Sequence, residues 1–177
     1  KALGGNSIGT VSSEHKVQFL ANLGFEAWLR EPSFGAQLKR EKRTFDLVLD
    51  AIGGEVQTAS FNALNPMGRL VVFGAAEFTP GKNRPNYLKA AWKYLRRPKY
   101  DVMDMISENR SVMAFNLIWL WDQVELMKEL LNTMMAVEIT PPYVGHEFDF
   151  EQAHEAIDCL RSGKTIGKVV LLINSEV

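Results

Sequence analysis

The sequence predicts an α/β protein with a doubly wound parallel sheet. This prediction rests mainly on residues 45–76. Two short apolar runs, Leu47–Leu49 and Leu70–Phe73, are too short for helices and too continuous for strands with one wet face. We therefore interpret them as parallel strands that are buried on both sides. Between them, residues 54–64 have apolar side chains at helical spacing, and Asn65–Gly68 predicts the turn that stops this helix. Strand, helix and strand in this order predict a right-handed βαβ unit.

The segments before and after this unit continue the alternation of strands and helices. Ser12-Ser13-Glu14 begins a helix that ends at Gly24, and Pro141-Pro142 marks a change of direction late in the chain. Asp149 is a candidate cap for the helix that follows it. The remaining predicted strands are 7–11, 26–29, 112–120, 143–148 and 169–173, and the remaining predicted helices are 34–43, 124–135 and 150–160.

Composition narrows the class of protein. With 177 residues and a net charge of −1, the chain is large enough to bury a core and gives no sign of a nucleic-acid footprint. Cys159 is the single cysteine, so neither a disulfide framework nor a Cys/His metal cluster is expected. No apolar run approaches the roughly 20 residues that span a bilayer. We therefore expect a cytoplasmic protein with a small-molecule substrate and without a metal site.

A long segment, residues 77–110, has no strand signal. Two short helices are predicted in it, over 88–95 and 102–106, and aromatic residues alternate with lysine and arginine between 88 and 100. An aromatic and basic helix of this kind could make peripheral contact with anionic lipid or cover a substrate. The simpler interpretation is a surface insertion whose aromatic residues pack down on the core.

The order of several motifs resembles a known family. DAIGGE (residues 50–55), NPMGRLVVFG (65–74), FNL (115–117) and GKVVLL (167–172) resemble the zinc-independent quinone oxidoreductases of the medium-chain dehydrogenase/reductase superfamily. The insertion that ends in ENRSVMAFNL is similar to the branch that contains the synaptic vesicle membrane protein (vesicle amine transport) oxidoreductases. Each motif is weak by itself, but the ordered set covers almost the whole chain.

The resemblance implies a Rossmann domain that binds NADPH and a second, GroES-like barrel domain, with hydride transfer to a quinone or an activated ketone or enone. We expect residues 1–138 to belong to the cofactor domain and 139–177 to the barrel. Catalytic residues are not assigned. The cofactor-binding residues that the resemblance implies are Ala51, Ile52, Gly53, Phe73, Gly74, Ala75, Phe115, Asn116, Leu117, Gly167 and Lys168.

Cofactor choice can be predicted from the end of the second expected Rossmann strand. NAD-selective enzymes usually have an acidic residue there, which bonds the ribose 2′-hydroxyl. This chain has Ser12 and Ser13, with Lys16 one turn into the helix. Hydroxyls and a cation suit a 2′-phosphate, so we predict NADPH.

Two departures from the family's pattern lead to further expectations. The family has a first strand and a glycine-rich turn before the segment with which this sequence starts, so we expect the chain to be the C-terminal portion of a longer protein. In the strand order 3-2-1-4-5-6 the first strand is central, and strands two and three lose their link to the others without it. The second departure lies at residues 28–31, where the family often has a tyrosine beside the adenine, and that residue is not assigned.

Three alternative interpretations of the chain remain. The chain by itself could be a non-enzymatic remnant that binds lipid or protein, or it could be inactive. An S-adenosylmethionine-dependent methyltransferase is the rival enzyme class, because NPMGRLVVF also resembles a turn and strand of that fold.

Residues 112–120 are rich in apolar side chains and are predicted to form the edge strand of the sheet, which would pair with a second copy in a homodimer.

Overall fold

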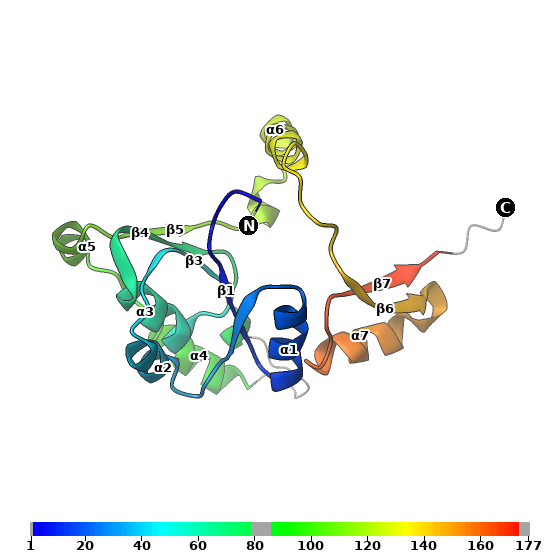
Figure 1. Ribbon diagram of the computed structural model, residues 1–177, viewed down its shortest axis with the longest axis horizontal. Helices are drawn as coiled ribbons and strands as arrows, with labels where there is room; N and C mark the ends of the chain where they lie inside the picture. Colours follow the sequence, from blue (N-terminus) through cyan, green and yellow to red (C-terminus); the bar gives the residue numbers. More distant parts are fainter. Residues whose placement is uncertain (1, 79–85, 174–177) are drawn as a thin grey trace. The chain divides into compact units, whose positions relative to one another are not determined.

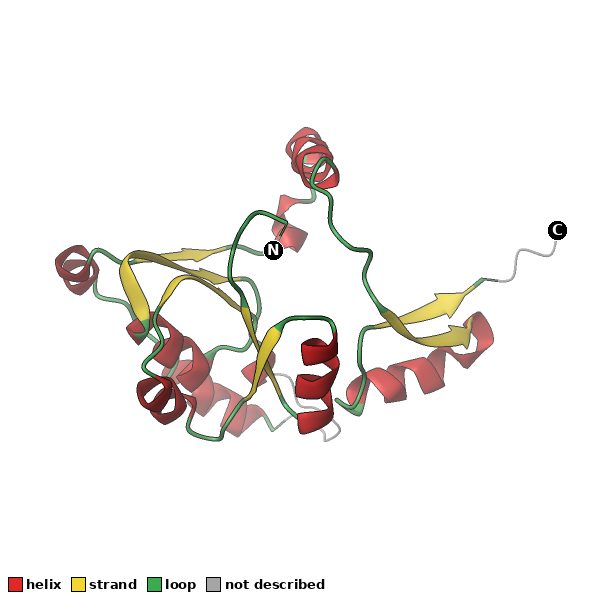
Figure 2. Ribbon diagram, in the orientation of Figure 1, coloured by secondary structure: helices red, strands yellow, loops and turns green. Residues whose placement is uncertain are grey.

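The computed structural model describes residues 2–78 and 86–173, which form two compact units (Figure 1). The larger unit begins at Ile8 and contains most of the helices and strands, and the smaller unit holds the chain from Met135 onward. Strands and helices alternate along the larger unit (Figure 2), which confirms the predicted α/β class. None of the helices described is long and apolar enough to cross a membrane.

The elements of the larger unit closely follow the predicted order. They are β1 (Ile8–Val11), α1 (Glu14–Asn22), β2 (Glu26–Leu29), α2 (Phe34–Glu41), β3 (Phe45–Asp50), α3 (Gly54–Asn62), β4 (Leu64–Val72), η1 (Ala76–Phe78), α4 (Tyr87–Leu95), α5 (Val102–Glu108), β5 (Ser111–Ala114), η2 (Leu117–Leu120) and α6 (Val124–Met135), where η denotes a 3-10 helix.

The strands of the larger unit form two separate parallel sheets. β1 pairs with β2, with Ile8 opposite Glu26, and β3, β4 and β5 pair in that order. Leu70 of β4 is the central residue of the second sheet, opposite Val48 on one side and Val112 on the other. Parallel pairing of β3 with β4 across α3 confirms the predicted βαβ unit. The break between the two sheets falls where the expected first Rossmann strand would lie.

Two predicted boundaries are wrong. Residues 65–68 are not a turn before the strand, because β4 already begins at Leu64, which pairs with Phe45. The next pair is Leu47 with Arg69, so five residues of β4 advance opposite two of β3 and the extra residues form a bulge. Met67 adopts a φ of 67° in this bulge, and its N–H donates to the Asn109 carbonyl at 2.6 Å.

The predicted strand 112–120 is also shorter than expected. β5 ends at Ala114, and Asn116 accepts a hydrogen bond from the Ile118 N–H at 3.0 Å through its side-chain oxygen. This bond caps a 3-10 helix, η2, which turns the chain out of the sheet. The apolar side chains of 117–120 therefore lie beyond the strand and not on it.

The core of the larger unit lies between α2 and α3 on one face of the second sheet. Phe34 and Leu38 of α2 pack against Ala59 and Ala63, with Trp28, Phe45 and Val56 around them. Leu70 of β4 is fully buried. On β3, however, Leu47 and Leu49 are 55% and 64% exposed. The expectation of strands buried on both sides is therefore met on one face only among the described residues.

The smaller unit contains β6 (Val144–Asp149), η3 (Phe150–Gln152), α7 (Ala153–Arg161) and β7 (Lys168–Leu172). β6 and β7 pair in parallel, and α7 packs on both strands through Ala156, which is buried. Asp149 caps the helical segment as predicted, in a capping box in which its own N–H donates to Gln152 Oε1 at 3.2 Å. The division of the chain at residue 138 into a cofactor domain and a barrel domain stays a prediction.

Candidate cofactor-binding site

The carboxyl ends of β3, β4 and β5 meet at one edge of the second sheet, because the three strands run parallel in adjacent positions. Ligands of open parallel sheets bind at this edge. The structure brings together nine of the residues predicted to bind cofactor, in three turns of three residues: 51–53 after β3, 73–75 after β4 and 115–117 after β5.

Asp50 shapes the first of these turns. It is 3% exposed, and its Oδ1 accepts the Ile52 N–H at 2.9 Å. Both carboxylate oxygens also accept the Gly53 N–H, at 3.3 and 3.2 Å. A buried carboxylate that is paired with backbone donors fixes the conformation of the chain at the start of α3. Asp50 is thus the structural support of a turn whose other residues were the predicted ligands.

The turns after β3 and β4 are joined through their backbones. The N–H groups of Phe73, Ala76 and Glu77 donate to successive carbonyls from the last residue of β3 onward, those of Asp50, Ala51 and Ile52, at 3.0, 2.9 and 2.9 Å. Gly74 lies so close to Ala51 that a Cβ at Gly74 would come within 3.0 Å of the Ala51 carbonyl oxygen. A side chain at Gly74 would therefore push the two turns apart by a few tenths of an ångström, and with glycine the edge presents bare backbone there.

Glu77 and Lys93 add a charged pair that the sequence did not predict. The Glu77 carboxylate lies in the space that a Cβ at Gly54 would occupy, at the first residue of α3. Lys93 of α4 donates from Nζ to the Glu77 backbone carbonyl at 2.8 Å and lies 3.5 Å from the carboxylate. A carboxylate at a helix N-terminus is favourable electrostatically. Lys93 belongs to the insertion, residues 77–110. The only sequence signal for its partly buried position would have been that it interrupts the polar face expected of α4.

The third turn follows directly from β5. The Phe115 N–H donates to the Val72 carbonyl at 3.1 Å, which continues the pairing of β5 with β4 by one residue. Phe115 and Leu117 are 52% and 57% exposed. Both side chains are therefore accessible to a ligand at the edge of the sheet where the turns after β3 and β4 also lie.

Ser12, Ser13 and Lys16 lie on the other sheet, at the end of β1 and the start of α1. Ser13 is the N-cap residue of α1, but its side chain makes no capping hydrogen bond. Its hydroxyl is buried and has no hydrogen-bond partner in the described part of the chain. A buried hydroxyl without a partner at a helix N-terminus is the donor that an anionic group could use.

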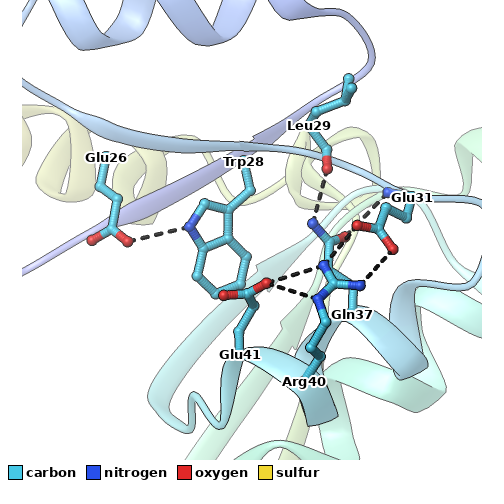
Figure 3. Close-up of polar contacts among 7 residues, drawn as sticks. All are labelled: Glu26, Trp28, Leu29, Glu31, Gln37, Arg40 and Glu41. Carbon is cyan, nitrogen blue, oxygen red and sulfur yellow. Dashed lines mark hydrogen bonds and ion pairs between the residues drawn. The ribbon is translucent and has the colours of Figure 1, made fainter.

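The turn after β2 is fixed by residues of α2 that the sequence did not indicate (Figure 3). Gln37 is 5% exposed, donates to the Leu29 carbonyl at 2.9 Å and accepts the Glu31 N–H at 3.1 Å. Arg40 donates to both oxygens of Glu31, at 3.1 and 2.7 Å, and also bonds Glu41. These hydrogen bonds hold the pKa of Glu31 below its ordinary value. At the turn where no adenine-side residue was assigned, the backbone is therefore hydrogen-bonded to Gln37, and Glu31 is paired with Arg40.

Gly167 and Lys168 belong to the smaller unit, at the start of β7. Gly167 has a φ of 73°, and a Cβ there would meet the carbonyl of Tyr143. Lys168 donates its N–H to the same carbonyl at 2.8 Å. The structure explains the glycine by this local contact, and the predicted approach of both residues to a cofactor stays a prediction.

A groove of about 620 Å³ lies elsewhere, between α2 and α3. Its lining includes Leu38, Ala59 and the cations Lys39 and Lys42, and none of the predicted cofactor residues. Within residues 2–78 and 86–173, no group of three His, Cys, Asp or Glu side chains could hold a metal ion. The bare backbone at Gly74 and the unpaired hydroxyl of Ser13 nonetheless suit a dinucleotide, so we place the candidate site at the strand ends.

Residues 25–171 match the zinc-binding dehydrogenase family. The chain belongs to this family. Its members include the medium-chain dehydrogenase/reductase proteins to which the motifs pointed, so the rival methyltransferase fold is not supported. A Danio rerio relative, the synaptic vesicle membrane protein VAT-1 homolog, is 28% identical over 169 residues, which cover 93% of this chain and 35% of the relative. VAT-1 of Tetronarce californica is 30% identical over 125 residues, which cover 70% of this chain and 32% of that protein.

Among solved structures, the quinone oxidoreductase of Thermus thermophilus, which was also solved in complex with NADPH, has a TM-score of 0.69 and 25% identity. The match covers 97% of this chain and 51% of that one. This zinc-binding dehydrogenase chain therefore spans about a third of the length of the VAT-1 relatives and about half of the quinone oxidoreductase. The α/β fold and the family are thereby established, and they agree with the resemblance seen in the motifs.

Proposed function

We propose that the chain supplies the nicotinamide-binding part of an NADPH-dependent oxidoreductase. The enzyme would transfer a hydride to a quinone or to an activated ketone or enone, without a catalytic zinc ion. The observation that carries this proposal is the convergence of the three turns after β3, β4 and β5, of which two are bonded backbone to backbone. The likeness to a quinone oxidoreductase that binds NADPH supports the choice of cofactor.

Each group of residues has a stated role in this proposal. The backbone at 51–53 and 73–75 would hold the ribose and the nicotinamide, because glycine there leaves room for close approach. Phe115 and Leu117 would cover the ring and exclude water from it. Ser12, Ser13 and Lys16 would bind the 2′-phosphate, and Gly167 and Lys168 are also proposed to bind the cofactor. NADPH, when bound, supplies the hydride, and the ketone or quinone oxygen takes up a proton.

Cofactor binding tests the proposal directly. The fluorescence of NADPH and NADH would be titrated with the purified chain, and S-adenosylmethionine binding would be measured by calorimetry as the control for the rival class. We expect binding of NADPH that is tighter than that of NADH, and no binding of S-adenosylmethionine. NADPH oxidation by the chain in the presence of a soluble quinone then tests the reaction. If the chain binds no nicotinamide cofactor, the proposed cofactor role of this chain is wrong, and either the non-enzymatic or the inactive interpretation replaces it.

We also propose that the protein forms a homodimer through residues 112–120. β5 is the outer strand of its sheet, and the η2 residues Ile118 and Trp119 that follow it are 74% and 82% exposed. Large apolar side chains with this exposure, beside an unpaired strand edge, favour association with a second copy.

A further inference from the structure

α4 is attached to the rest of the larger unit by a charged side chain. The sequence suggested that the aromatic residues of the insertion pack down on the core, but Trp92 and Tyr87 are 58% and 80% exposed. Lys93, by contrast, has a side chain that is only 30% exposed. Residues 86–100 contain five lysines and arginines, and within the described part of the chain Lys93 alone among them forms an ion pair. Its contact with Glu77 therefore anchors the helix.

Glu77 connects this anchor to the turn after β3. Its N–H donates to the Ile52 carbonyl at 2.9 Å, and the Lys93 Nζ donates to the Glu77 carbonyl at 2.8 Å. The Glu77 carboxylate, which lies 3.5 Å from the Lys93 Nζ, also fills the space that a Cβ at Gly54 would occupy. One residue thus contacts α4 and the turn that leads into α3, through both its backbone and its side chain.

The turn after β4 runs directly into the same contact. Residues 73–75 are followed by η1, in which the Ala76 N–H donates to the Ala51 carbonyl at 2.9 Å. A displacement of Glu77 would therefore change the spacing of residues 51–53 and 73–75, the two turns proposed to hold the ribose and the nicotinamide. Loss of Lys93 would also leave the Glu77 carboxylate without a countercharge beside a site for an anionic cofactor.

We propose that Lys93 is a positioning residue for the nicotinamide half of the cofactor site. It acts through Glu77 and holds the turns after β3 and β4 in the arrangement that the cofactor uses, so less ordering is required on binding. The inference rests on the proposed function, because it assumes that these turns bind the cofactor. It adds that α4 and the cofactor are energetically coupled. Such coupling is reciprocal, so a bound cofactor also holds α4 in place.

Ligands that differ in their nicotinamide half test the proposal. Lys93→Met keeps most of the side-chain length and removes the charge and the hydrogen-bond donor. Calorimetric titration with NADPH and NADH should show equal losses of affinity, of about fivefold or more. Adenosine 2′,5′-bisphosphate carries the 2′-phosphate but no nicotinamide, and its affinity should not change, because Ser12, Ser13 and Lys16 lie on the other sheet. A general loss of folding would instead weaken all three ligands.

Lys89→Met is the matched control. It removes the same charge from an exposed position of α4 that has no ion pair in the described residues, and it should change none of the three affinities. An equal loss in Lys89→Met, unchanged NADPH and NADH affinities in Lys93→Met, or an equal loss for adenosine 2′,5′-bisphosphate would overturn the proposal.

Hydrogen exchange tests the reciprocal effect in the wild-type chain, independently of any variant. NADPH should slow the exchange of the amides of residues 87–95, and adenosine 2′,5′-bisphosphate should not. Unchanged exchange in α4 on NADPH binding would overturn the coupling. If the wild type binds neither NADPH nor NADH, the proposed function fails and this inference fails with it. If the wild type binds both and Lys93→Met binds them equally well, this inference alone fails.

Discussion

The carboxylate of Glu77 occupies the space that a side chain at Gly54 would need. This contact, together with the backbone bonds between the turns after β3 and β4, sets how closely those turns approach. Gly54 also has a φ of 57°, which disfavours any residue with a Cβ. Two separate physical constraints therefore act at one position, and they can be separated by experiment.

Gly54→Ala should lower the free energy of unfolding by about 2–3 kcal/mol, from backbone strain and from displacement of Glu77. Gly163→Ala is the matched control, because Gly163 has a φ of 69° with no atom within 4 Å of the added Cβ. We expect it to cost only the strain, about 1 kcal/mol. Urea unfolding followed by circular dichroism measures both. Equal losses for the two variants would show that Glu77 does not crowd Gly54.

Gln37→Leu should destabilise the chain by at least about 2 kcal/mol, because it leaves the Leu29 carbonyl and the Glu31 N–H without the partner seen in the structure. Gln18→Leu is the control, since Gln18 is exposed and bonds only the neighbouring turn of α1. Urea midpoints would be compared at constant pH. A cost for Gln37→Leu no larger than that of the control would contradict the role given to its amide.

Lys16→Ala should weaken NADPH binding about tenfold or more and leave NADH binding nearly unchanged, because a cation interacts with the 2′-phosphate that NADH lacks. The dissociation constants of both cofactors would be measured by fluorescence titration. Lys39→Ala removes the same charge from α2 and should change neither. Equal losses of NADPH and NADH affinity in Lys16→Ala would remove Lys16 from the site.

Tyr100 should make stability depend on alkaline pH. Burial, and secondarily the charge of Asp50, raises the pKa of Tyr100 to about 12. A pKa that is higher in the folded than in the unfolded state stabilises the fold below pH 10, and this contribution is lost as the pH rises towards 12. Comparing urea midpoints of wild type and Tyr100→Phe from neutral pH upward isolates it. Identical pH profiles would be inconsistent with a raised pKa in the folded state.

Tyr100→Phe should not destabilise the protein at neutral pH. The Tyr100 hydroxyl is buried without a hydrogen-bond partner in the described residues, and its ring lies 4.8 Å from that of Phe61. Phenylalanine keeps the ring contact and removes the unsatisfied hydroxyl. Because Tyr100→Phe should be as stable as the wild type at neutral pH, a stability difference that appears only at alkaline pH can be assigned to ionisation of the Tyr100 hydroxyl.

Trp119→Glu should convert the proposed dimer into a monomer, because it places a charge in an apolar interface. Trp28→Glu is unsuitable as a control because Trp28 packs against the core, so Leu160→Glu, at an exposed position of α7, is used instead. Sedimentation velocity at micromolar concentration gives the oligomeric state. A wild-type monomer would count against the interface.

The sequence predicted the elements with strong local signals. α6 has the predicted bounds because apolar residues recur at helical spacing along it. β2 also has the predicted bounds, although its sequence signal is weaker. The end of β5 was missed because it depends on a single side-chain bond, from Ile118 N–H to Asn116. β4 begins earlier than predicted because Asn65–Gly68 forms a bulge. A bulge is defined by how a strand pairs with its neighbour, so it cannot be predicted from the sequence of β4 alone.

The predicted cofactor residues have two different origins. Ala51–Gly53 and Phe73–Ala75 were placed at strand ends because each follows an apolar run, and the ends of parallel strands meet. Phe115–Leu117 came only from the family resemblance, since the sequence placed them inside the predicted strand 112–120. Gln37, Glu77 and Lys93 could not be predicted, since each makes its contact across a distance in the sequence that no periodicity encodes. Lys93 in particular lies on a helix whose exposed side is apolar, the reverse of the usual pattern.

The break between β1–β2 and β3–β5 has a consequence for how the larger unit unfolds. No strand pairing joins the two sheets in the described residues, so their mutual support passes through the side chains around α2, where Trp28 of β2 and Phe45 of β3 flank Phe34 and Leu38. Backbone ladders propagate cooperativity along a sheet, whereas a small side-chain cluster couples its neighbours weakly. We therefore predict that the amide protons of the two sheets exchange with different opening free energies.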